Sequence, residues 1–206
     1  MTKCAILGAS GHGKVVGEIV SLNQFNCIDF FDDDYPNKSH VEHWPVCGTF
    51  IDLKERCLEY DIVVVAIGEN STRYKKQLEL ESLGATFSVL AHPSAVISQF
   101  ASISPGTVVM ANACVNPFAK VGKACIINTN STIEHDCLVQ AGVHVSPSAS
   151  LGGGAQIGLC SWVGIGASVR HMISIGANVI VGAGAAVTSN VADCSTVVGI
   201  PARPKH

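Results

Sequence analysis

The sequence has little charge, few aromatic residues and no long apolar run. Of its 206 residues 14% are charged and 6% are aromatic, whereas 48% are hydrophobic. This balance excludes an intrinsically disordered chain and a highly charged helical bundle. The net charge of −3 comes without any cluster of Lys or Arg, and such a cluster is what nucleic acid or an anionic membrane surface requires. We therefore expect neither as a partner.

The sequence also lacks a membrane span, a signal peptide and a recognisable cysteine motif. Gly, Asn and Ser interrupt every apolar segment before it reaches the roughly 18 residues of a membrane span, and the start MTKCAILGAS lacks the basic and apolar regions of a signal peptide. The nine cysteines are odd in number and form no CxxC pair, so neither a disulfide framework nor a zinc site is expected. We expect a compact cytoplasmic protein that needs no metal and whose cysteines are small buried side chains.

The second half of the chain repeats with a period of six. From Ile97 to Val187 every sixth residue is aliphatic, and the residue two positions earlier is mostly small. A period of six fits neither an α-helix nor a flat strand. It fits short strands separated by corners, with three strands in each triangular coil, so that equivalent residues of successive coils stack about 4.8 Å from one another. The unbroken register predicts about five coils.

Gly or Asn recurs just after the aliphatic position, where we expect it to ease the backbone through the bend. The positions are Gly122, Asn128, Gly152, Gly158, Gly164, Gly176 and Gly182. The whole pattern resembles the left-handed parallel β-helix of hexapeptide-repeat acyltransferases, most of which are trimers. Residues 93–206 are therefore expected to form this fold, with a C-terminal tail. The same fold also carries other activities, including carbonic anhydrases, so the period alone does not define the chemistry.

Residues 1–92 alternate between strand and helix signals. Strands are expected at KCAILG, CIDFF, DIVVVAIG and TFSVL, and the glycine-rich GASGHG connects the first strand to a helical KVVGEIVSL. This alternation predicts a Rossmann-like α/β domain whose parallel sheet binds ligand at the carboxyl ends of its strands. The helix N-terminus offers N–H groups and a positive dipole to a phosphate.

Two nucleotide ligands are compatible with this domain. Asp32 lies where an acidic residue holds an NAD ribose, but the glycine spacing is GxxGxG rather than GxGxxG, and about 90 residues are few for a complete dinucleotide fold. The alternative comes from a resemblance to the PglD/NeuD/PerB-type nucleotide-sugar N-acetyltransferases. That resemblance rests on GASGHGKVV, the acidic cluster after the second strand, AIGxNxxR, HPSA at residues 92–95 and the closing GIPAR.

The resemblance implies three groups of substrate contacts in this domain. Ser10, Gly11 and His12 would approach the nucleotide-sugar phosphates, Asp32 and Asp33 would lie near the base or ribose, and Gly68 and Arg73 would border the same cleft. The competing interpretations are a tight glycine turn that binds nothing and, for Arg73, a solvated helix residue.

The candidate base lies in the repeat region. Acetyl transfer to an amine requires a group that removes a proton and donors that stabilise the oxyanion. His135 follows the inward-facing Ile133 by two residues, so it should project outward near a corner, with the neighbouring Asp136 carboxylate able to orient its ring. The segment resembles the family's INTxxxxEH stretch, which implies that His135 is the general base, Asp136 its partner and Asn128 a substrate contact.

The acetyl-coenzyme A contacts come from two arguments. The stacking of successive coils places Gly153 directly above His135, where its N–H can serve as an oxyanion donor; the alternative is that this glycine only eases a corner. By resemblance, His144, Ile165 and Ala183 line the coenzyme groove, which in this family lies between the subunits of a homotrimer.

Together these features predict an acetyl-CoA-dependent enzyme. The resemblance implies the reaction, which is N-acetylation of the 4-amino group of a UDP-, dTDP- or GDP-linked 4-amino-4,6-dideoxyhexose for surface glycans. The alternatives are a sialic acid O-acetyltransferase, a non-catalytic nucleotide-binding trimer, and a carbonic anhydrase with three metal-binding histidines. Against the last, His135, His144 and His171 lack the spacing of the HxxxxH pair that such sites use.

Overall fold

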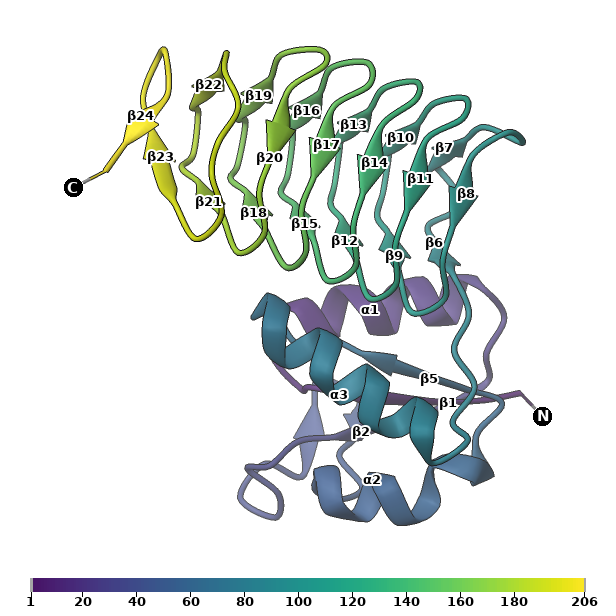
Figure 1. Cartoon of the computed structure of the whole chain (residues 1–206). Coiled ribbons are helices and arrows are strands. Elements are labelled where there is room, and N and C mark those ends of the chain that lie inside the picture. The colour runs from purple at the N-terminus through teal and green to yellow at the C-terminus, as the bar shows by residue number, and fades with distance from the viewer. Residues whose placement is uncertain (1, 206) are drawn as a thin grey trace. The chain divides into compact units, whose positions relative to one another are not determined.

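The computed structural model describes residues 2–205 and divides into two compact units, Met1–Leu90 and Ala91–His206 (Figure 1). The division falls two residues before the boundary expected from the sequence. Among residues 2–205, no helix is long and apolar enough to cross a membrane. Of the nine cysteines, Cys4, Cys57, Cys125 and Cys137 are buried.

The N-terminal unit is built on a three-stranded parallel sheet. Its strand order is β2 (Cys27–Phe31), β1 (Lys3–Leu7) and β5 (Ile62–Val65). Around the sheet are α1 (Gly11–Leu22), α2 (Phe50–Arg56), a 3₁₀ turn (Cys57–Glu59), α3 (Asn70–Ser82) and a hairpin of β3 (His40–Val41) and β4 (Trp44–Pro45). The central strand β1 is buried from Cys4 to Leu7, as expected for a strand with neighbours on both sides.

Three of the four strands expected in this unit are confirmed as β1, β2 and β5. The prediction of a fourth strand at TFSVL is wrong. Residues 86–89 of the fourth segment form no strand, although Val63 N–H donates to Thr86 O at 2.8 Å. Only Leu90 pairs, as the start of β6 (Leu90–Ala91). An apolar run of this length does not reveal whether a neighbouring strand is available. Helix α2 was not expected, although Thr49 and Asp52 form a reciprocal capping box at its start.

The C-terminal unit is a parallel β-helix with three faces, visible in Figure 1 as stacked coils. Face 1 contains β7 (Val96–Ile97), β10 (Cys114–Val115), β13 (Thr132–Ile133), β16 (Ser150–Leu151), β19 (Ser168–Val169) and β22 (Ala186–Val187). Face 2 contains β8 (Ser102–Ile103), β11 (Lys120–Val121), β14 (Leu138–Val139), β17 (Gln156–Ile157) and β20 (Ser174–Ile175). Face 3 contains β6, β9 (Val108–Val109), β12 (Ile126–Ile127), β15 (His144–Val145), β18 (Trp162–Val163), β21 (Ile180–Val181), β23 (Thr196–Val198) and the antiparallel β24 (Arg203–Pro204).

The predicted register is confirmed at every coil. Each strand from β7 to β22 ends on one of the aliphatic residues of the repeat, and strands one coil apart pair in parallel, as in Ile133 with Leu151. From Val109 to Val187 these side chains are at most 3% exposed and form one continuous core. Burial of aliphatic side chains at each level therefore defines the coil.

The glycines just after the strands do not bend the backbone as expected from the sequence. The left-handed backbone conformation recurs every six residues from Gly106 to Gly184, but two positions later than expected, for example at Asp136 (φ 59°) and Gly154 (φ 68°). The glycines just after the strands instead permit close coil stacking. A Cβ on Gly158 would lie 2.4 Å from the Gly176 carbonyl carbon, a separation far inside van der Waals contact.

Candidate active site

His135 lies at the corner between β13 and β14, and its side chain is 62% exposed. Its Nδ1 is 2.8 Å from Asp136 Oδ2. The left-handed conformation of Asp136, which Asp tolerates better than most residues, accompanies this contact between neighbouring side chains. When Nδ1 carries the proton and donates to Asp136, the lone pair of Nε2 remains available to a substrate.

Gly153 lies directly above His135 in the stack. The Gly154 N–H donates to His135 O at 2.8 Å, and a Cβ built on Gly153 would be 2.6 Å from His135 Nε2. The imidazole therefore occupies the space that a side chain at Gly153 would need. Among residues 2–205 the Gly153 N–H has no hydrogen-bond acceptor, so it is free to donate to a ligand. We call residues 134–136, 152–154 and 170–172 the His135 corner.

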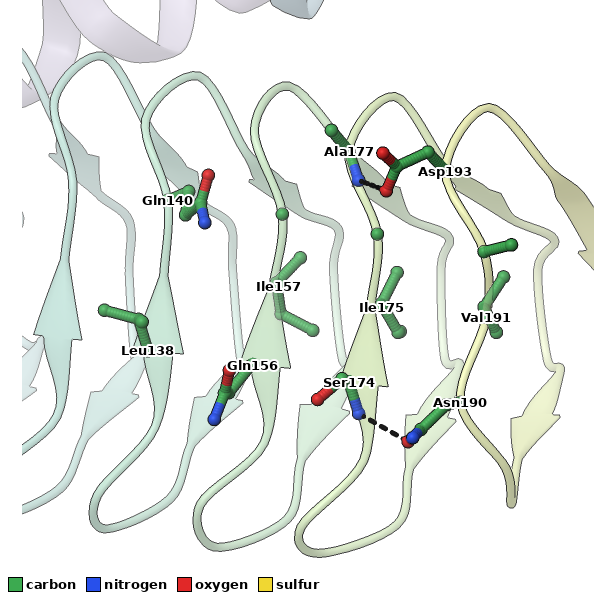
Figure 2. A pocket seen from close by; sticks show the side chains of 13 residues that line it. Leu138, Gln140, Gln156, Ile157, Ser174, Ile175, Ala177, Asn190, Val191 and Asp193 are labelled. Atoms are coloured by element: carbon green, nitrogen blue, oxygen red, sulfur yellow. Dashed lines mark hydrogen bonds between the residues drawn. The ribbon is translucent and has the colours of Figure 1, made fainter.

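Face 2, which continues from the His135 corner, carries a groove of about 610 Å³ over its later coils. Figure 2 shows it between Leu138, Gln156, Ser174, Asn190 and Asp193. At its far end Asn190 Oδ1 accepts the Ser174 N–H at 2.9 Å, and Asp193 Oδ1 accepts the Ala177 N–H at 2.8 Å (Figure 2). These side chains satisfy backbone donors after the regular strands of face 2 end. The groove was not expected from the sequence.

The other residues expected in the repeat region lie elsewhere on the coil. Asn128, Ile165 and Ala183 occupy the turns between face 3 and face 1, which we call the Asn128 corner (residues 128–130, 146–148, 164–166 and 182–184). Asn128 Nδ2 donates to His144 Nε2 at 3.0 Å. Face 1 separates this corner from His135, so the structure brings Asn128 and His144 together but does not bring either to His135.

His144 also has an aromatic neighbour that the sequence reasoning missed. Its ring stacks on Trp162, with the ring centroids 5.4 Å apart and the planes at 13°. Trp162 Nε1 donates to Ser146 Oγ, which fixes the indole. His144 and Trp162 hold equivalent positions in successive coils, and this spacing was the available signal. Ile165 beside them is 60% exposed, so this corner presents an unusually apolar surface.

In the N-terminal unit, the expected substrate contacts follow the carboxyl ends of the three parallel strands. Ser10 and Gly11 follow β1, Asp32 and Asp33 follow β2, and Gly68 follows β5. Helix α1 begins after Ser10 without a side-chain cap and without an acidic residue in its first turn. Its first N–H groups have no acceptor among the described residues, which leaves them available to an anion.

The two aspartates also organise these loops. Asp32 Oδ2 accepts the Ala9 N–H at 2.7 Å and lies 3.7 Å from Lys38 Nζ, so it links the loops after β1 and β2. Asp33 Oδ1 accepts the Phe50 N–H at the start of α2. Both carboxylates therefore have structural contacts in the absence of a ligand.

His12 and Arg73 form the buried part of this region. The Arg73 side chain is 1% exposed, which contradicts the interpretation of a solvated helix residue. Its Nη1 donates to Ile67 O and Gly68 O, and its Nη2 donates to Asn70 Oδ1. Burial, and secondarily the Arg73 charge, lowers the pKa of His12 to about 4. His12 Nε2 is buried without a hydrogen-bond partner in the described part of the chain, which is costly unless a ligand pairs with it.

No group of three or more metal-ligating side chains occurs among residues 2–205. His135 lies at the corner between faces 1 and 2, His144 lies on face 3, and His171 is two coils above His135. The three histidines considered for a carbonic anhydrase site are therefore not gathered in one place within the chain.

Comparison with known proteins agrees with this architecture. The PglD N-terminal domain family matches residues 3–80. The acetyltransferase domain of PglB from Neisseria gonorrhoeae, solved with acetyl coenzyme A, is 40% identical, with 98% of each chain covered and a TM-score of 0.94. PerB from Caulobacter crescentus, solved with CoA and GDP-perosamine, is 32% identical over 100% of this chain and 98% of that chain, with a TM-score of 0.93.

A curated relative, UDP-N-acetylbacillosamine N-acetyltransferase of Bacillus subtilis, is 39% identical over 114 residues, which are 54% of this chain. The match spans about half (52%) of that relative's length. The full-length structural matches confirm the predicted α/β domain followed by a left-handed β-helix. The chain belongs to the PglD/NeuD/PerB-type nucleotide-sugar N-acetyltransferases of the hexapeptide-repeat acyltransferase superfamily.

Proposed function

We propose that this protein transfers the acetyl group of acetyl-coenzyme A to the 4-amino group of a nucleotide-linked 4-amino-4,6-dideoxyhexose, with His135 as general base. The observation that carries the proposal is the pairing of His135 Nδ1 with Asp136, which leaves Nε2 beside Gly153, whose N–H has no acceptor among residues 2–205. Relatives solved with acetyl coenzyme A, or with CoA and GDP-perosamine, support the two substrate classes.

The arrangement suits acyl transfer. As the amine nitrogen attacks the thioester carbonyl, His135 Nε2 takes the proton that the nitrogen loses. The Gly153 N–H donates to the oxyanion of the tetrahedral intermediate. When the carbon–sulfur bond breaks, the protonated His135 returns the proton to the leaving thiolate. Asp136 accepts the Nδ1–H throughout and stabilises the imidazolium that forms between these two steps.

The N-terminal unit supplies the proposed nucleotide-sugar site. The phosphates would lie at the open N-terminus of α1, against the N–H groups of Gly11 and His12. A neutral His12 can donate from its buried Nε2 when that nitrogen carries the proton. Arg73 holds the carbonyls of the loop that includes Gly68, so we assign it the role of shaping this loop. A thermal-shift series with UDP, dTDP and GDP will identify the nucleotide, because the ligand that binds stabilises the fold.

We further propose a homotrimer in which each site is shared. The predicted acetyl-CoA contacts at the Asn128 corner lie across face 1 from His135, so a ligand that touches both sets fits between two copies better than on one. A mixture of two inactive variants, His135→Ala and His144→Ala, should then regain activity when their subunits exchange. Sedimentation that shows an active monomer would refute the shared site.

The direct test of the base is His135→Ala, assayed by thiol release from acetyl-CoA with a nucleotide-linked amino sugar. We expect kcat to fall by about 10²-fold or more, with little change in acetyl-CoA affinity. Part of the activity should return at higher pH, where more of the amine is already deprotonated. A near-normal kcat at neutral pH would place the base elsewhere. Absence of thiol release by the wild-type protein with every such acceptor, despite nucleotide binding, would favour a non-catalytic binding trimer.

A further inference from the structure

The His135 corner carries an ordered sequence of charges from one coil to the next. Glu134 and Asp136 flank His135, Gly152–Gly154 form the coil above, and Arg170–Met172 form the coil above that. The ladder bonds Glu134 N–H to Leu151 O and Gly152 N–H to Val169 O show that these turns stack in register. Acidic groups therefore lie beside the base, and a cation lies about 10 Å higher, two ladder spacings away.

Arg170 is isolated from other charges. It is the sole Lys or Arg between Ala124 and Ala202 in the sequence. Its side chain is exposed, and no ion pair or side-chain hydrogen bond of Arg170 occurs among residues 2–205. A lone exposed cation contributes little to the stability of the coil, so its place on this corner has no structural explanation within the chain.

The coil between the base and Arg170 is open to a long, flexible ligand. Its three glycines contribute no side chains, and the Met172 thioether lies over Gly154, where a Cβ would be 2.5 Å from Met172 Sδ. Met172 is 74% exposed and offers a polarisable apolar surface. The corner thus presents the base, then glycine backbone with the Met172 thioether over Gly154, then a positive charge.

Acetyl-coenzyme A has the matching order of groups. Its thioester is separated from the phosphates by a pantetheine arm that is longer than two coil spacings. Phosphates near Glu134 and Asp136 would be repelled, whereas phosphates near Arg170 form charge-assisted hydrogen bonds. We propose that Arg170 binds the phosphates of acetyl-coenzyme A and so directs the coenzyme along the His135 corner toward the C-terminal coils. This inference rests on the proposed thioester position at His135.

The test compares two donors and three variants. Arg170→Gln should raise the KM for acetyl-CoA about tenfold, the range for one lost hydrogen bond to a charged group. It should leave the KM for acetyl-pantetheine, which carries no phosphate, at the wild-type value. Lys120→Gln removes the same charge from face 2 one coil below His135 and outside the proposed site, so it should change neither constant. Arg170→Lys, which keeps the charge, should recover part of the acetyl-CoA affinity.

Three results would overturn the proposal. An unchanged KM for acetyl-CoA in Arg170→Gln would show that Arg170 does not bind the donor. An equal loss with both donors would assign Arg170 a structural role. An effect of Lys120→Gln in place of Arg170→Gln would mean that the coenzyme runs in the opposite direction. These outcomes are independent of the identity of the base, which the kcat of His135→Ala reports separately.

Discussion

The contact between Gly153 and His135 leads to a specific prediction for Gly153→Ala. The new Cβ would lie 2.6 Å from His135 Nε2 and 2.7 Å from Cε1, whereas ordinary contact begins at about 3.5 Å. The ring must therefore move by about 1 Å or rotate away from the corner. Gly153 itself has no left-handed backbone, so alanine should add no backbone strain and the fold should keep its stability.

The expected consequence is a loss of rate without a loss of structure. A displacement of about 1 Å at a reacting group costs about 10²-fold in rate. Gly153→Ala should therefore lower kcat to nearly the level of His135→Ala, while the melting temperature stays close to the wild-type value. The backbone N–H remains in the variant, so the effect reports the position of the imidazole rather than the loss of an oxyanion donor.

A double-mutant cycle isolates this mechanism. If Gly153 acts by leaving room for the ring, Gly153→Ala should have almost no further effect on kcat in the His135→Ala background. A wild-type kcat in the single variant would refute the reasoning. An equal fall of kcat in both backgrounds would show that the added methyl group obstructs the substrate and not the base.

Two more predictions concern the N-terminal unit. Burial lowers the pKa of His12 from its usual 6.5 to about 4, so the unfolded chain binds the extra proton between these values. The free energy of unfolding should then fall by up to about 3 kcal/mol as the pH drops through this window. Urea titrations at several pH values should show a flatter profile for His12→Asn, and an identical profile would contradict the assignment. Gly13→Ala should lower the melting temperature markedly, because the new Cβ would overlap the Gly8 carbonyl oxygen. Gly11→Ala, with no atom within 4 Å of the new Cβ, is the matched control in the same helix and should be almost neutral.

The six-residue period of the sequence was sufficient to predict the β-helix and its register. The coil repeats after every third hexapeptide, and each level must bury one aliphatic side chain per face, so the period of the sequence determines the register of the strands from β7 to β22. The same arithmetic is enough to place Gly153 over His135. The contact between His135 and Asp136 was equally accessible, since the two residues are neighbours in the chain.

Other features depended on contacts that no local pattern contains. The distance between two coils decides whether a glycine after a strand serves to bend the backbone or to leave room for the next coil. The sequence does not contain this distance, so the expectation that Gly158 eases a bend was wrong. Arg73 is buried because the carbonyls of the loop after β5 accept hydrogen bonds from its guanidinium group. Asp32, expected only as a substrate contact, also accepts the Ala9 N–H because the loop after β1 lies beside it.

The sequence by itself therefore determined the two-part organisation, the coil register and the residues that lie together on one corner. These properties follow from periodic burial along the chain, which is a local constraint. Only the tertiary structure decided that Trp162 stacks on His144, that the Arg73 side chain is buried, and that the glycines after the strands permit close coil stacking. These properties depend on the direction in which each side chain leaves the coil and on what packs beside it, and both are set by residues distant in sequence.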